Sequence, residues 1–198
     1  FGWSCSLSAD GTIVSVGGAR YDSYNGIVRV YQYSSTGSSI DWVQVGQDIV
    51  GSTINDGGTF TLLGGDYTLF RGTYDSNALW NERVGWSCSL SADGSILVVG
   101  AINGDDGATL ETGSAKVYVL DQNTWKQSGE TMYGDSYNER FAWAVSISSN
   151  GQHIAVGAPN FAESSIGVVK IFSLPGNTVF SLGDSQTNKL ELTSDEFT

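Results

Sequence analysis

The sequence predicts an all-β protein made of four-stranded antiparallel blades, which is a β-propeller or a large part of one. Three observations predict this fold. Gly is abundant at 26 residues and Pro is scarce at 2, a composition typical of short strands joined by tight turns. A strand-turn-strand segment occurs three times, beginning at Phe1, Val84 and Phe141. Two of these copies share the stretch GWSCSLSADG, which identifies an internal repeat.

Each copy begins with a predicted β-hairpin. In the first copy, Trp3, Cys5 and Leu7 alternate with serines, as expected for a strand with one apolar face. Asp10-Gly11 follows, and both residue types tolerate the positive φ angles of a tight turn. A second apolar strand is expected from Ile13 to Val16. The equivalent positions are Trp86, Cys88, Leu90, Asp93-Gly94 and Ile96 to Val99 in copy two, and Trp143, Val145, Ile147, Asn150-Gly151 and Ile154 to Val156 in copy three.

Two further strands complete each unit. The third strand is predicted at Ile27 to Tyr31, Ala115 to Tyr118 and Val168 to Phe172. The fourth begins at Trp42 in the first copy, and its counterparts begin at Trp125 and Val179. Four short strands joined by turns form the unit of a propeller blade.

These units divide the chain within one domain. We assign blade 1 to residues 1–56, blade 2 to 84–140 and blade 3 to 141–198. Residues 57–83 contain their own hairpin signal and are either a degenerate blade or an insertion. Because three blades do not ordinarily close a ring, either this region completes a small ring, the chain is part of a longer protein, or a neighbouring chain covers the open ends.

The charge and hydropathy of the chain limit the classes of partner that it is expected to bind. The net charge is −12 with only 9 Lys and Arg residues, whereas nucleic-acid binding needs a basic surface. No apolar run approaches the roughly 18 residues of a membrane helix, so we expect neither nucleic-acid binding nor membrane insertion. Charged residues make up 15% of the chain. Such a weakly charged surface suits an extracellular, cell-surface or lumenal location.

The repeat resembles the FG-GAP family, the repeat of integrin-like β-propellers and of secreted proteins in marine bacteria and heterokont algae. Phe1-Gly2, Val84-Gly85 and Phe141-Ala142 stand at the "FG" position, and Gly157-Ala158-Pro159 stands at the "GAP" position. The resemblance implies a propeller and a non-catalytic adhesion or scaffolding role with other protein subunits. Integrin-type blades also carry an acidic calcium loop. Here the corresponding turn has a single acidic residue, such as Asp10, so those calcium sites are not transferred.

One other loop is a candidate calcium site. Asn103, Asp105, Asp106 and Glu111 lie close together in the sequence between two predicted strands of blade 2. Ca²⁺ prefers carboxylate and amide oxygens of this kind. The alternative is a solvated Gly-Asp turn. No other cofactor is expected.

The six tryptophans fall into two groups. Trp3, Trp86 and Trp143 are expected to fill the core between blades, since large rings bury much apolar area. Trp42, Trp80 and Trp125 are candidates for an exposed surface on which a sugar stacks. They support the alternative that the chain is a carbohydrate-binding module.

The remaining polar candidates favour structural roles. Arg29, Lys116 and Lys170 share one position of the third strand; they are either a basic ring or charges balanced by nearby carboxylates. Cys5 and Cys88 are expected to be free and buried rather than disulfide-bonded. The sequence shows no catalytic triad, zinc cluster or nucleotide-binding loop. We therefore expect a binding module rather than an enzyme, with a propeller glycosidase as the weaker alternative.

Overall fold

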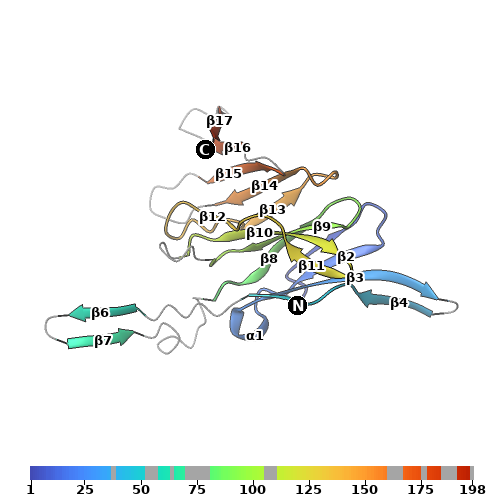
Figure 1. The fold of residues 1–198 in the computed structure, drawn as a ribbon, viewed down its shortest axis with the longest axis horizontal. Coiled ribbons are helices and arrows are strands. Elements are labelled where there is room, and N and C mark those ends of the chain that lie inside the picture. Colours follow the sequence, from blue (N-terminus) through green and yellow to red (C-terminus); the bar gives the residue numbers. More distant parts are fainter. Residues whose placement is uncertain are drawn as a thin grey trace.

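The computed structural model describes residues 1–36, 39–51, 58–62, 65–69, 81–104, 111–159, 167–174, 178–183 and 191–196. The described chain is all-β, with antiparallel strand pairing inside each sheet and one helical turn, α1 (Tyr21–Tyr24). Figure 1 shows three sheets arranged one above another in chain order. The prediction of an all-β protein with antiparallel sheets is confirmed. The sheets do not close on themselves.

The first two sheets have the same architecture. The first has the order β1-β2-β3-β4 and contains β1 (Ser4–Leu7), β2 (Ile13–Gly17), β3 (Ile27–Thr36), β4 (Ser39–Gln44) and β5 (Ile49–Val50), which pairs with β3. The second has the order β11-β10-β9-β8 and contains β8 (Val84–Leu90), β9 (Ile96–Ala101), β10 (Ser114–Asp121), β11 (Thr124–Gln127) and β12 (Met132–Tyr133), which pairs with β10. The four strands predicted for each unit therefore form one sheet.

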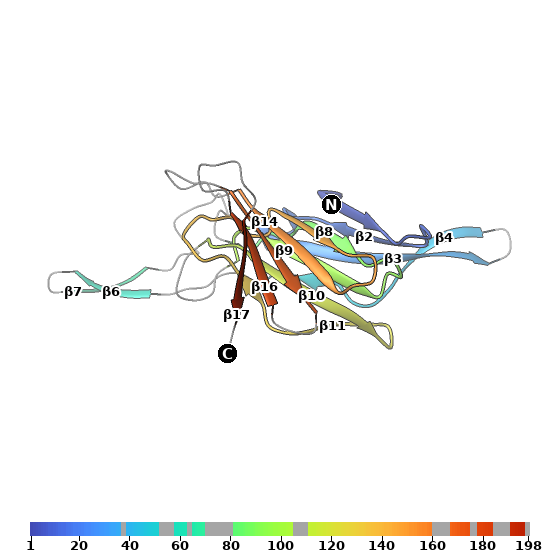
Figure 2. The ribbon, with the colours of Figure 1, turned by 90° about the horizontal axis from the view of Figure 1, so that it is seen from above.

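The third sheet runs in simple chain order. It contains β13 (Ala144–Ile147), β14 (His153–Ala158), β15 (Val168–Ser173), β16 (Thr178–Gly183) and β17 (Glu191–Glu196). The region between blades 1 and 2 contains β6 (Gly58–Leu62) and β7 (Gly65–Leu69), which pair with each other in a separate two-stranded sheet. The hairpin signal in residues 57–83 is thus confirmed. In Figures 1 and 2 this hairpin lies at the end of the molecule opposite the β3–β4 hairpin.

The turns explain why each unit starts as a hairpin. The Asp10 carboxylate accepts hydrogen bonds from the Ser8 hydroxyl at 2.7 Å and from the Thr12 N–H at 3.0 Å. Asp93 and Asn150 accept the corresponding bonds in the other two copies. These bonds hold the pKa of Asp10 and of Asp93 below the usual range, with the serine hydroxyl as the largest cause in each case. The Asp or Asn side chain at this position therefore stabilises the turn through hydrogen bonds to its own neighbours in the sequence.

The core lies between the sheets, and the second sheet is buried on both faces. Leu97 and Val99 of β9 pack toward the first sheet in one cluster, together with Val28 and Val30 of β3. Val98 of β9 packs in a second cluster with residues of the third sheet. Adjacent residues of a strand point to opposite faces, so β9 consists almost entirely of apolar residues. Among the described residues, no helix is long and apolar enough to cross a membrane.

Candidate binding surfaces

The contacts that join the first sheet to the second are repeated between the second and the third. The Ser4 hydroxyl donates to the Gly85 carbonyl at 2.9 Å, and the equivalent Ser87 hydroxyl donates to the Ala142 carbonyl at 2.7 Å. Backbone bridges between the sheets are repeated in the same way, since Gly26 pairs with Val84 and the equivalent Gly113 pairs with Phe141. Further equivalent pairs are Leu90 N–H to Ser6 Oγ and Ile147 N–H to Ser89 Oγ, and Ala9 N–H to Ala92 O and Ala92 N–H to Ser149 O.

Trp125 anchors the interface between the first two sheets. The residue is only 2% exposed, and its Nε1–H donates to the Val45 carbonyl at 3.0 Å. Its backbone N–H donates to Gln47 Oε1 at 3.0 Å, and Gln47 Nε2 donates back to the Trp125 carbonyl at 2.6 Å. The expectation that Trp125 is exposed is therefore wrong, because a neighbouring unit covers its ring.

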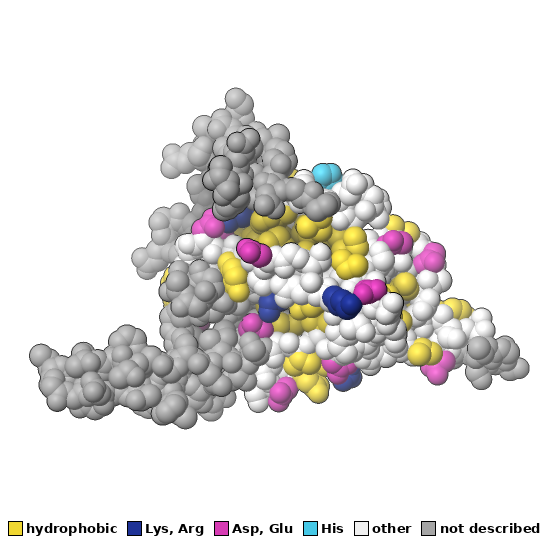
Figure 3. Space-filling view, in the orientation of Figure 1, with side chains coloured by type: hydrophobic (Ala, Val, Ile, Leu, Met, Phe, Trp, Pro, Cys, Tyr) yellow, Lys and Arg dark blue, Asp and Glu magenta, His cyan; other side chains and the backbone are white. Residues whose placement is uncertain are grey.

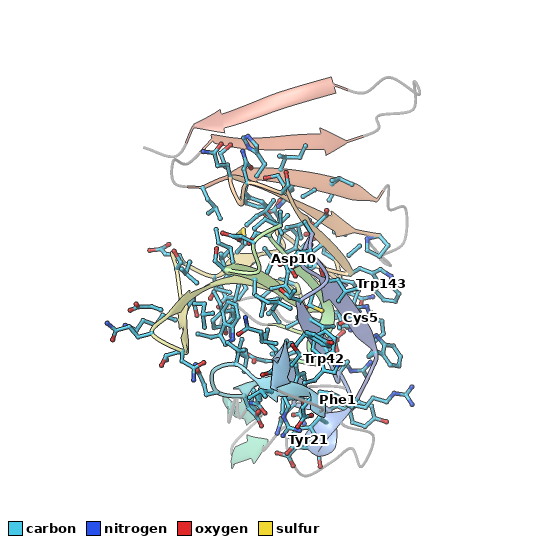
Figure 4. All side chains as sticks on the ribbon, turned by 90° about the vertical axis from the view of Figure 1, so that its right-hand side faces the viewer. Phe1, Cys5, Asp10, Tyr21, Trp42 and Trp143 are labelled. Atoms are coloured by element: carbon cyan, nitrogen blue, oxygen red, sulfur yellow. The ribbon has the colours of Figure 1, made fainter. Side chains whose placement is uncertain are left out.

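The equivalent face of the first sheet is open. Phe1 is 64% exposed, Leu7 59% and Trp42 41%, and Cys5 is exposed as well. Their equivalents in the second sheet are buried against the first sheet; they are Val84, Cys88, Leu90 and Trp125. Figure 4 labels Phe1, Cys5 and Trp42 on the first sheet. We call Phe1, Cys5, Leu7 and Trp42 the open face of the first sheet.

The third sheet presents a complementary face at β13. Ser146 is the equivalent of Ser6 and Ser89, whose hydroxyls each accept an N–H from the next sheet. Ala144 takes the place of Ser4 and Ser87, and both Ala144 and Ser146 are exposed. Val169 of β15 is also exposed. The described part of the chain thus has an open face at each end of the stack of sheets.

Three tryptophans form a ladder with one ring from each repeat. The ring centroids of Trp3 and Trp86 are 4.7 Å apart, and those of Trp86 and Trp143 are 4.8 Å apart. The prediction that the three units contact one another through their indole rings is confirmed. The expectation of a buried core is wrong for the two ends, because Trp3 is 44% exposed and Trp143 is 38% exposed. We refer to Trp3, Trp86 and Trp143 as the tryptophan ladder.

Arginines gather beside the ladder. The Arg20 Cζ atom lies 5.3 Å from the Trp3 ring centroid, and Arg83 Cζ lies 6.0 Å from that of Trp86. Both guanidinium groups also contact Tyr24, at 5.9 and 5.1 Å from its ring centroid. Tyr24 therefore links the two arginines into one cluster.

Arg83 is electrostatically unusual. Burial lowers the pKa of Arg83, and the nearby positive charges of Arg140 and Arg20 also lower it, against the opposing effect of Tyr24 and Glu111. Its Nε atom is buried and has no hydrogen-bond partner among the described residues. A buried donor without a partner is costly, and like charges gathered in this way are typical of a functional site.

The other described cations are paired with carboxylates. Arg29 forms a two-point ion pair with Asp48 at 2.8 and 2.7 Å. Lys116 pairs with Glu82 at 3.6 Å and Lys170 with Asp135 at 2.6 Å. In Figure 3 the Lys and Arg groups visible on this face lie next to Asp or Glu groups. Each member of the predicted basic ring thus has a carboxylate partner, as the structural alternative expected.

Two members of the candidate calcium loop contact a cation. Arg140 donates a hydrogen bond to Asn103 Oδ1 and forms an ion pair with Glu111 at 2.9 Å. Asp105 and Asp106 lie outside the described residues, so the calcium site stays a prediction. Within the described ranges, no group of three or more His, Cys, Asp or Glu residues could hold a metal ion.

The other candidates have mixed outcomes. Trp42 is exposed, as expected for a stacking surface, and its role in sugar binding stays a prediction; Trp80 lies outside the described residues. Both cysteines are free, as predicted, but only Cys88 is buried.

The sequence analysis did not identify Arg20 as a candidate binding residue. The signal available in the sequence was an Arg followed by Tyr21 in the segment that precedes a strand.

Comparison with known proteins adds no relatives. No protein-family model matches the chain, and no curated protein matches it.

Proposed function

We propose that this chain is a non-catalytic binding and scaffolding module of the β-propeller type, which docks onto other protein units through the faces of its sheets. The observation that carries the proposal is the open face of the first sheet. Phe1, Leu7 and Trp42 are exposed there, while the equivalent side chains of the second sheet are buried against a neighbouring unit. Exposed apolar groups of this kind are typical of interaction sites.

The propeller arrangement is part of the same proposal. Equivalent hydrogen bonds join the first sheet to the second and the second to the third. Repeating one interface relates successive sheets by a similar rotation, which is how blades follow one another in a propeller. The resemblance to FG-GAP repeats also supports this arrangement.

The partner that best fits the open face is the third sheet of a second copy. The face that covers Leu90 in the second sheet includes Ser6, whose hydroxyl accepts the Leu90 N–H at 3.0 Å. The third sheet carries Ser146 at the equivalent position, and this serine is exposed. Docking of unlike faces in this way is heterologous, and it closes into a ring when the rotation permits.

We further propose that the module works in an extracellular, cell-surface or lumenal assembly. The charged fraction of 15% supports this location, as does the resemblance to secreted repeat proteins. A non-catalytic role agrees with the structural contacts that several described polar side chains make. For example, His153, the single histidine, is exposed and hydrogen-bonds to Ser173 Oγ at 3.1 Å.

Sedimentation velocity over a range of protein concentrations tests the proposal. We expect the unmodified chain to associate as the concentration rises. Leu7→Glu should abolish association, because it places a charge where the equivalent Leu90 is 6% exposed in an interface.

Val43→Lys is the matched control. Val43 is also exposed on the first sheet, but its equivalent in the second sheet is the exposed Lys126. This control should associate like the unmodified chain. The proposal fails if the unmodified chain stays monomeric at every concentration, or if Leu7→Glu associates as strongly as Val43→Lys.

A further inference from the structure

The arginines beside the tryptophan ladder, Arg20 and Arg83, differ from the other cations because they form no ion pair with a described residue. Five of the seven Lys and Arg residues with described side chains form ion pairs. Arg20 and Arg83 form no ion pair with a described carboxylate, and both guanidinium groups lie over aromatic rings. In a chain with 21 Asp and Glu residues and only 9 Lys and Arg, two neighbouring guanidinium groups without an ion-pair partner among the described residues form an unusual local positive charge.

The backbone around these residues is strained. The described chain has ten non-Gly residues with positive φ. Eight of them lie in α1 next to Arg20, at Arg83 itself, or among residues that include or contact Arg140 and lead to Trp143. They are Asp22, Ser23, Tyr24, Arg83, Glu111, Asn138, Arg140 and Ala142. Non-Gly residues adopt this conformation at a cost, and such residues cluster at functional sites.

We propose that Arg20 and Arg83, together with the tryptophan ladder, bind a sugar that carries a single anionic group, either a carboxylate or a sulfate ester. This site uses residues other than those of the open face, so it is independent of the docking described above.

Each part of the ligand has a counterpart in the cluster. A guanidinium group binds a carboxylate or sulfate through strong, charge-assisted hydrogen bonds. An anion there relieves the repulsion among Arg20, Arg83 and Arg140. The exposed indoles of Trp3 and Trp143 offer apolar, electron-rich faces, and the C–H groups on one face of a sugar ring pack well against such faces.

The overall charge favours a sparsely charged ligand. The net charge of −12 repels a dense polyanion such as a nucleic acid or a heavily sulfated chain. One anionic group can still be neutralised by the local arginines, because a partly buried charge is screened less than an exposed one. Arginine clusters also recognise acidic peptide motifs, but the partly exposed indoles beside these arginines favour a sugar, whose C–H groups pack against aromatic rings.

Isothermal titration calorimetry of the full chain with four probes tests this proposal. The probes are a galacturonate trimer, a monosulfated galactose trimer, a neutral galactose trimer and an acidic peptide of similar charge. We expect at least one of the two anionic sugars to bind at least about tenfold more tightly than the neutral sugar. The stronger of the two identifies the anionic group.

Variants connect the binding to the named residues. Arg20→Gln should weaken binding of the anionic sugar about tenfold or more, whereas Lys126→Gln, at an exposed ion pair, should leave it unchanged. Trp3→Ala should also weaken it, because Trp3 is 44% exposed beside Arg20. Thermal melting of each variant checks that it is folded. If Trp3→Ala does not fold, the comparison of Arg20→Gln with Lys126→Gln still tests the proposal.

Several results would overturn the proposal. They are no binding of either anionic sugar, equal affinity for the neutral sugar, tighter binding of the acidic peptide, or equal losses in Arg20→Gln and Lys126→Gln. Failure of this experiment does not affect the sedimentation test, since the two tests use different residues.

Discussion

The first two sheets share nearly the same sequence at their apolar positions, yet they place these side chains in opposite environments. Trp125 is buried in an interface and hydrogen-bonded through its indole N–H, while the equivalent Trp42 is exposed and contacts only Tyr33 among the described aromatic rings. Cys88 is buried, while Cys5 is exposed. The difference lies in the neighbours, because the first sheet covers the second, whereas no unit among the described residues covers the first. Equivalent apolar side chains of the repeat are thus buried where a neighbouring unit lies against them and exposed where no described unit does.

The largest expected effect comes from the tryptophan pair. Trp125→Ala should lower the free energy of unfolding by about 3–5 kcal/mol, because it removes a buried ring and leaves a cavity. Trp42→Ala should cost at most about 1 kcal/mol, because its ring is already partly in water. Chemical denaturation of both variants measures the difference. Equal losses would show that the two faces are not in opposite environments.

A smaller effect is expected for the serines that cross between sheets. Ser87→Ala should cost about 1–3 kcal/mol, because the buried Ala142 carbonyl loses its hydroxyl donor. Ala144 occupies the same position of the third sheet and is exposed. Ala144→Ser should therefore change the free energy of unfolding by no more than about 0.5 kcal/mol. A comparable change in both variants would argue that the hydroxyl acts only within its own strand.

The smallest expected effect is on the free energy of unfolding at low pH. The pKa of Asp10 and of Asp93 is lower in the folded chain than in the unfolded chain. Each carboxylate therefore contributes stability at a pH above its unfolded value, and this contribution is lost as the pH falls through the folded pKa. The third copy has the non-titrating Asn150 in this role. The double variant Asp10→Asn and Asp93→Asn should make the unfolding free energy less dependent on pH below about pH 4. Denaturation at a series of pH values measures this slope, and an unchanged slope would contradict the role of these turns.

The strands were predictable because their signals are local. Alternating residues such as Trp86, Cys88 and Leu90, followed by Asp93-Gly94, specify a hairpin without reference to the rest of the chain. The contact of the three indoles was also predictable, since the repeat places one ring in each unit. The division of unit 1 from unit 2 followed from the repeat in the same way.

The burial of individual rings was not predictable from the sequence. Trp42 and Trp125 have closely similar local sequences, so only the presence or absence of a neighbouring unit decides their exposure. Arg20 was missed for a related reason. It lies in a variable loop, and its proximity to Arg83 arises from the packing of one sheet against the next.

The reactivity of the two thiols tests the central claim most directly, because both equivalents occur in one chain and form no disulfide. A thiol reagent added to dilute folded protein should modify Cys5 rapidly. Cys88 should react only after denaturation, because burial removes access and raises the pKa of its thiol. Mass spectrometry of the modified peptides distinguishes the two residues. Modification of Cys5 before Cys88 is the result that we predict, and similar rates for both thiols in the folded chain would contradict the contrast between the open and the buried face.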